Sequence, residues 1–132
     1  MVNQGESAPS PEQKNNTYYQ MSTTTQITCD WTGKSGKKYK YYVHPLGANF
    51  KDEGGNYIFC KKNPQGRWTP QYVGQTNSLK DRLGHHEKEA CAKRNGATHI
   101  HAHLNSTESS RLVEEKDLVT NYKPTCNEQL VG

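Results

Sequence analysis

The chain has 132 residues, of which 30% are hydrophobic, so its length and composition suit one compact domain with a modest core. No run approaches the roughly 18 to 20 consecutive apolar residues of a membrane-spanning helix, and the N-terminus lacks the apolar stretch of a secretory signal. We therefore expect a soluble, cytoplasmic protein with no membrane partner. The formal net charge of +4 permits a polyanionic partner without indicating one.

The four cysteines, Cys29, Cys60, Cys91 and Cys126, lie far apart, with no CxxC pair among them. They do not form the clustered framework of a small secreted domain, so we predict free thiols in a reducing compartment. Nothing in their spacing favours a zinc site.

Residues 1–25 are rich in Gln, Asn, Ser, Thr and Pro and carry almost no aliphatic side chains. Such a segment buries too little apolar surface to offset the entropy of ordering, so we expect a disordered tail. Residues 26–31 and 39–44 are rich in β-formers and flank a turn-forming stretch at 32–36, which predicts a hairpin. With the following loop, this hairpin forms an N-terminal extension over residues 26–53.

A second hairpin is predicted from residues 56–61 and 70–75, joined through Asn63-Pro64-Gln65-Gly66. From Asn77 to Gly96 the pattern is helical, with Leu79, Leu83 and Ala90 on one side. Residues 98–104 alternate as a strand with Ile100, Ala102 and Leu104 inward, and a helix follows over 107–122. The order hairpin, hairpin, helix, strand, helix indicates an α+β fold, with a small, mainly antiparallel sheet flanked by helices.

The last predicted helix carries a carboxylate on its apolar face. At about 100° per residue, Leu112, Leu118, Val119 and Tyr122 share one face with Glu115 near its middle, whereas Glu114 lies at the edge as the ordinary solvated residue. An ionised group there is paired, bound to a metal or exposed at a cleft. A shallowly packed helix with Glu115 paired to a Lys or Arg is an equal alternative.

The preceding helix places Arg82 and His86, spaced i and i+4, together on the flank of its apolar stripe, while His85 points away. Arg can grip a phosphate with two donors, and His can hold or pass a proton near neutral pH. Taken alone, this pattern more often reflects a helix edge that simply carries polar groups than a functional site.

The order of several short motifs resembles the GIY-YIG nuclease superfamily. The resemblance covers residues 55–127 and rests on Gly55-Asn56-Tyr57-Ile58-Phe59, Tyr72-Val73-Gly74, Arg82, His86, Glu115, Leu118-Val119, Pro124 and Asn127. Asn56 and Val73 depart from the usual aliphatic residues of the two strand motifs. The resemblance assigns residues 54–132 to a nuclease-like domain and leaves the first hairpin outside it.

The resemblance implies hydrolysis of DNA phosphodiester bonds with one divalent cation, Mg²⁺ or Mn²⁺, held by Glu115 and by phosphate oxygens. Arg82 would neutralise charge on the phosphate and Tyr57 would be the general base, with His86 as its hydrogen-bond partner. Tyr72 would position phosphate or water, and Asn127 would fix the end of the last helix near the metal.

Four lysines of the first hairpin, Lys34, Lys37, Lys38 and Lys40, are candidate contacts to the DNA backbone, although a solvated basic hairpin is the commoner explanation. Nucleases of this kind usually borrow specificity from attached domains. Three alternatives stay open for this chain: a specificity-providing protein partner, recognition of DNA structure rather than sequence, or cutting with little selectivity.

Two other functions remain open. One is a nucleic-acid-binding module that has kept the fold and lost turnover. The other is a metal-binding protein, in which His99, His101 and His103 alternate on one strand face and chelate zinc or nickel.

Overall fold

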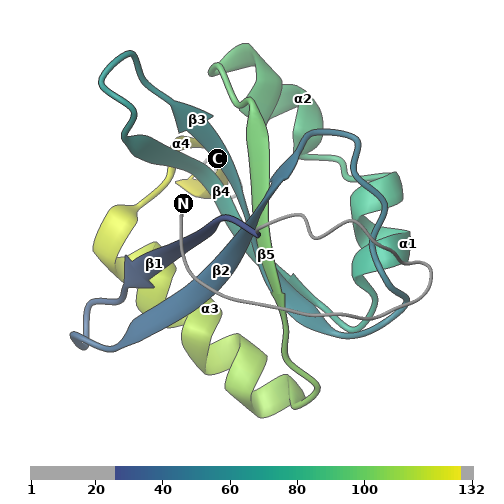
Figure 1. Cartoon of the computed structure of the whole chain (residues 1–132). Helices are drawn as coiled ribbons and strands as arrows, with labels where there is room; N and C mark the ends of the chain where they lie inside the picture. The colour runs from purple at the N-terminus through teal and green to yellow at the C-terminus, as the bar shows by residue number, and fades with distance from the viewer. Residues whose placement is uncertain (1–25, 129–132) are drawn as a thin grey trace.

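The computed structural model describes residues 26–128, which form a five-stranded sheet with helices against it (Figure 1). The predicted tail at 1–25 lies outside these residues. The strands are β1 (Thr28–Thr32), β2 (Lys38–Pro45), β3 (Gly55–Lys62), β4 (Trp68–Thr76) and β5 (His99–Leu104). The helices are α1 (Leu79–Gly84), α2 (Glu89–Arg94), α3 (Glu108–Tyr122) and α4 (Thr125–Glu128). Within residues 26–128, no helix is long and apolar enough to cross a membrane.

Every strand pairing is antiparallel, which confirms the predicted α+β class. The sheet order is β1-β2-β5-β3-β4, so β5 lies between the two predicted hairpins and joins them. Both hairpins are present within a few residues of their predicted limits. The N-terminal hairpin therefore extends the sheet across β5.

The register defines two faces of the sheet, since directly opposed residues point to the same side. Tyr42, Ala102, Tyr57 and Gly74 stand opposite one another across β2, β5, β3 and β4. Their face also carries Phe59 and packs against α1 and α2, and we call it the α1 face. The opposite face, the α3 face, buries Trp31, Tyr41, Ile58, Cys60 and Val73 against Leu118. Figure 1 shows α1 and α2 on one side of the sheet and α3 on the other.

The single helix predicted over 77–96 is wrong, because α1 and α2 are separated by a non-helical connection. The predicted start of the helix is close to that of α1, where the Ser78 hydroxyl caps the helix by accepting the Asp81 N–H. After Gly84 the chain leaves helical geometry at His85, and His86 takes over the local hydrogen bonds: its ring accepts the Lys88 N–H and its carbonyl accepts the Glu89 N–H. The break also leaves Ala90 exposed, contrary to its predicted inward position.

The predicted inward faces of β5 and α3 also need correction. Leu104 is 48% exposed and Leu112 is 45% exposed, whereas Glu114, expected in solvent, is only 3% exposed. The buried stripe of α3 consists of Arg111, Glu114 and Leu118. This stripe meets tyrosine and histidine side chains from the sheet, so hydrogen bonds as well as apolar contacts fix the helix phase.

The prediction of free thiols is wrong for two of the four cysteines. Cys91 and Cys126 form a disulfide between α2 and α4, with Cα atoms 6.0 Å apart, whereas Cys29 and Cys60 are free. The pairing partners are 35 residues apart in sequence. Only the tertiary placement of α4 beside α2 brings them together.

Candidate functional site

Tyr57 is almost completely buried on the α1 face, on the interior strand β3. Its direct partner on β4 is Gly74, and a Cβ atom built on that glycine would lie 2.5 Å from the Tyr57 hydroxyl oxygen. The close approach leaves no room for a side chain. The glycine of the second motif therefore makes space for the tyrosine of the first.

The Tyr57 hydroxyl lies 2.6 Å from Nε2 of His86. On the other side of the ring, Nδ1 of His86 accepts the Lys88 N–H at 2.9 Å, so Nδ1 carries no proton. Burial, with smaller effects from the Arg82 and Lys88 cations, lowers the pKa of His86 to about 4, so the ring is neutral at pH 7. The single ring proton is therefore on Nε2, and His86 donates it to the Tyr57 oxygen.

Tyr57 itself is held as a neutral phenol. Burial raises its pKa well above the ordinary range, the nearby Tyr72 adds to this, and hydrogen bonding to Arg82 opposes it. Arg82 reaches this group from α1 and also pairs with Glu87 at 3.7 Å. That ion pair is solvent-exposed, so it is weak and easily exchanged.

Glu115 lies close to the same tyrosines. Burial raises the pKa of its carboxyl group, and the carboxylate in turn raises the pKa values of Tyr57 and Tyr72. Among residues 26–128, no side chain forms a hydrogen bond or ion pair with the Glu115 carboxylate. Within that part of the chain, the pairing with a Lys or Arg that would make Glu115 purely structural is not formed.

Asn127 binds the backbone of β4 with both ends of its amide. Its Oδ1 accepts the Val73 N–H at 2.7 Å, and its Nδ2 donates to the Val73 carbonyl at 2.9 Å. This pair of bonds imitates a neighbouring strand along β4, which is an edge of the sheet. Asn127 thus fixes α4 to the residue between Tyr72 and Gly74.

The structure adds one residue that the sequence did not single out. Arg111 is buried four residues before Glu115 on α3, where its Nε donates to Gln75 Oε1 and its Nη1 donates to the Asn105 carbonyl. Both acceptors are uncharged. The i, i+4 spacing to Glu115 was its only signal in the sequence, and such spacings are too common to be diagnostic.

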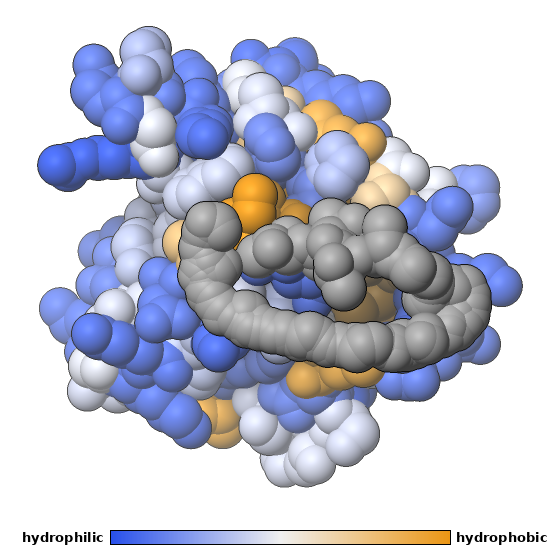
Figure 2. Space-filling model, viewed as in Figure 1, coloured by the Kyte–Doolittle hydropathy of each residue, from blue (hydrophilic) through white to orange (hydrophobic). Residues whose placement is uncertain are grey.

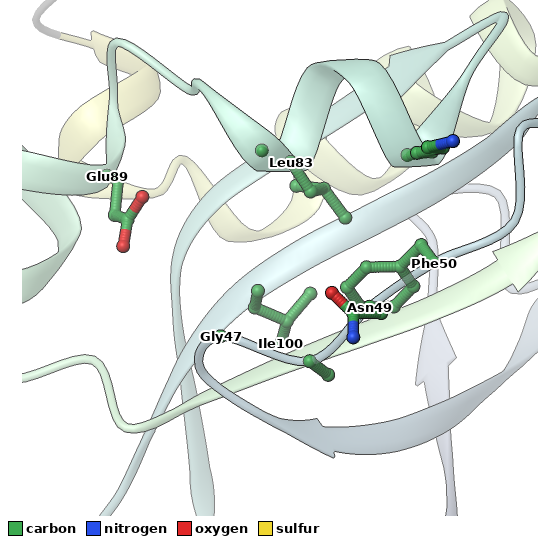
Figure 3. Close-up of a pocket in the computed structure, with 9 residues that line it drawn as sticks. Gly47, Asn49, Phe50, Leu83, Glu89 and Ile100 are labelled. Atoms are coloured by element: carbon green, nitrogen blue, oxygen red, sulfur yellow. The ribbon is translucent and has the colours of Figure 1, made fainter.

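A hollow of about 330 Å³ with a mixed polar and apolar lining lies beside α1. Figure 3 shows Leu83, Phe50 and Ile100 pointing toward one another in its centre, with Glu89 to one side. One wall of the hollow is formed by α1, the helix that carries Arg82.

The histidines of β5 do not form the metal site considered above. His101 is fully buried and its Nδ1 accepts from Trp31 Nε1 at 3.0 Å, while His103 Nε2 lies 2.6 Å from Glu114 Oε2. Within residues 26–128, no group of three or more His, Cys, Asp or Glu residues is placed to bind a metal ion. The alternative of a three-histidine site is therefore wrong.

The chemistry around Glu115 fits a single hard cation that keeps much of its water. Mg²⁺ is commonly held by one or two carboxylates together with water and substrate phosphate, without a full protein cage. Glu115 matches that donor set, because its carboxylate is half-buried and has no partner in the described part of the chain. Arg82, a side chain suited to binding phosphate, acts on the same tyrosine, Tyr72.

No protein-family model matches the chain, and no curated protein sequence matches it either. The structure is similar to solved structures of the GIY-YIG N-terminal endonuclease domain of UvrC from Thermotoga maritima, in point mutants described as bound to the catalytic divalent cation. Three of these have 26%, 26% and 27% sequence identity and TM-scores of 0.48, 0.47 and 0.47. Each comparison covers 61% of this chain and 87% of the other.

Proposed function

We propose that this protein is a metal-dependent endonuclease that hydrolyses DNA phosphodiester bonds with one divalent cation, Mg²⁺ or Mn²⁺, held by Glu115. One observation carries the proposal: the Glu115 carboxylate, without a partner in residues 26–128, shares its surroundings with two tyrosines and an arginine. DNA as the substrate rests on the motif resemblance and agrees with the positive net charge.

Glu115 and oxygens of the substrate phosphate would hold the cation. When bound, such a cation stabilises negative charge on the phosphate and lowers the pKa of nearby acids. Burial disfavours the charged form of Glu115 in the protein alone. A bound cation would stabilise that carboxylate.

Arg82 would bind the phosphate from α1. A guanidinium presents two parallel donors to phosphate oxygens and stays charged at all relevant pH values. Its exposed pair with Glu87 costs little to exchange for a substrate phosphate. Arg82 would thus neutralise the charge that develops as the phosphate is attacked.

Tyr57 would act as the general base, with Tyr72 positioning the phosphate or the attacking water. Burial alone makes Tyr57 a poor base. The His86 Nε2–H that points at its oxygen and the Arg82 guanidinium both favour the phenolate, which gives the phenol a route to accept a proton. Asn127 would hold β4, and with it Tyr72, in place.

Cleavage of supercoiled plasmid DNA by the full chain tests the proposal. We expect nicking that requires Mg²⁺ or Mn²⁺ and stops with a chelator, and a loss of about 100-fold or more in rate for Glu115→Ala. Glu108→Ala, an exposed carboxylate in the first turn of the same helix, is the matched control and should cut normally.

Undiminished cutting by Glu115→Ala would reject the assignment of the metal ligand. DNA binding without a product in any divalent metal would instead identify a non-catalytic binding module. Plasmid and branched substrates compared with and without cell extract would reveal a partner that supplies specificity.

A further inference from the structure

The N-terminal hairpin is held rigidly along one side. Asp117 of α3 accepts hydrogen bonds from the Ser35 N–H at 2.9 Å, the Ser35 hydroxyl at 2.7 Å and the Tyr39 hydroxyl at 2.9 Å. Further along β2, the Tyr41 hydroxyl donates to Glu114 Oε2 at 2.5 Å. The α3 face of the hairpin is thus fully engaged with the helix.

The other side of β2 is exposed. Because side chains alternate along a strand, Lys38, Lys40 and Tyr42 all point to the α1 face, away from Tyr39 and Tyr41. Lys38 and Lys40 are exposed, and Tyr42 is 36% exposed, one of the few large hydrophobic side chains left in solvent among residues 26–128. We call these three residues the hairpin platform.

The hairpin platform is continuous with the candidate site. Tyr42 stands opposite Ala102, and Ala102 stands opposite Tyr57, so the two tyrosines share one face in one row. Two strand spacings of about 4.8 Å place their backbones roughly 10 Å apart. At the rise of about 3.4 Å per nucleotide of a strand with stacked bases, that corresponds to roughly three nucleotides.

We propose that the hairpin platform binds a single-stranded segment of DNA next to the phosphate that is cleaved, with Tyr42 stacking on an unpaired base and Lys38 and Lys40 contacting phosphates. Aromatic rings flanked by cations on a sheet surface bind single strands in this way, because every base has a stacking face that is free only when unpaired. The inference rests on the proposed function and names its substrate class: DNA with unpaired nucleotides beside the cut.

The charges of the hairpin separate into two groups. Lys34 lies in the turn, where its peptide N–H donates to the Asp117 carbonyl, and the Lys37 ammonium lies 5.4 Å from the centre of the Tyr39 ring, on the α3 side. Lys38 and Lys40 are on the platform. Figure 2 shows mostly hydrophilic atoms in the lower left, where Figure 1 places the tip of this hairpin.

A negative charge lies next to Lys40 on the same face. Asp30 stands directly opposite Lys40 and is also exposed. Opposite charges on directly opposed, exposed strand residues attract only weakly, so Lys40 remains available to a phosphate. Removing Asp30 should then strengthen DNA binding.

The test is binding of fluorescent 12-nucleotide DNA by the full chain, measured by anisotropy in a chelator so that no cleavage occurs, at several salt concentrations. We expect Lys38→Ala/Lys40→Ala to reduce the slope of log affinity against log salt by about 1.4, since each phosphate contact to a single strand contributes about 0.7. Lys34→Ala/Lys37→Ala removes the same charge and should leave the slope nearly unchanged.

Tyr42→Ala should weaken binding of the single strand by roughly tenfold, while Tyr42→Phe, which keeps the ring, should bind normally. Neither change should alter binding of a blunt duplex. Equal losses from both lysine pairs, or a Tyr42→Ala variant that binds the single strand as the wild type does, would overturn the inference.

A separate measurement keeps this inference distinct from the proposed hydrolysis. Metal-dependent hydrolysis of a small phosphodiester, bis(p-nitrophenyl) phosphate, depends on Glu115 and should be unchanged in Lys38→Ala/Lys40→Ala. If Glu115→Ala leaves this hydrolysis intact, the proposed function fails. The binding experiment tests only whether the hairpin platform binds single-stranded DNA.

Discussion

Glu114 and Glu115 are neighbours on α3, yet they lie in two very different regions of the molecule. Glu114 is buried on the α3 face, where one oxygen accepts the Tyr41 hydroxyl and pairs with His103. Glu115 faces the candidate site and has no hydrogen-bonding partner within residues 26–128. A buried carboxylate that is paired within the protein stabilises the fold, whereas one held without a protein partner is available to a ligand.

The largest expected effect comes from a substitution on the α3 face, at Glu114. Glu114→Ala should lower the free energy of unfolding by about 3 to 5 kcal/mol, because it leaves the buried Tyr41 hydroxyl and the partly buried His103 ring without their partner. Urea denaturation measures the change. Activity per folded molecule should persist, and a stable but inactive Glu114→Ala protein would show that the two carboxylates do not have separate roles.

The disulfide tests the site region. Cys91 and Cys126 close a loop with a sequence separation of 35, so replacing both with Ser should lower stability by about 2 to 4 kcal/mol. The change should also loosen α4 and the Asn127 bonds to Val73, with faster amide exchange at Val73. Loosening of the hairpin instead of β4 would contradict this division of the molecule.

A smaller effect concerns pH. His86 at the site and His101 on the α3 face both have pKa values lowered to about 4, chiefly by burial. The unfolded chain binds protons near the ordinary histidine value of about 6.5, before the folded protein does. Stability from both histidines is therefore present above that pH and is lost as the pH falls toward 4.

Denaturation midpoints measured from pH 7.5 to 4.5 should show this decline in the wild type. His101→Gln and His86→Gln should each flatten the curve, because glutamine does not titrate. Only His86→Gln should also change the pH profile of DNA cleavage. A His101→Gln variant with an altered profile would argue against the separation of the two regions.

Much of the fold follows from local pattern, and the failures have one physical origin. Alternation and turn residues predicted both hairpins, β5 and α3, because each element is dictated by its own residues. Helical phase assumed that apolar residues face inward, and this misplaced Leu112 and Glu114. The hairpin meets α3 with tyrosine hydroxyls, so a polar stripe is buried there instead.

The candidate site shows the same limit. Motif order singled out Tyr57, Tyr72 and Arg82, and helical phase preferred His86 over His85, of which the structure buries only the first. That helical phase assumes one continuous helix over residues 77–96, whereas the structure has two short helices, with His86 in the connection between them. The disulfide, the Asn127 bonds and the burial of Arg111 depend on contacts between distant segments, which no local pattern encodes.

Binding of Mn²⁺ tests the central claim most directly, because it needs neither DNA nor turnover. Electron paramagnetic resonance of Mn²⁺ titrated with the full chain reports the free ion. We expect the wild type and Glu114→Gln to bind one ion, and Glu115→Gln to bind none while unfolding at an equal or higher temperature at pH 7, since the buried charge is removed. Binding of one Mn²⁺ by Glu115→Gln as tightly as by the wild type would contradict the account.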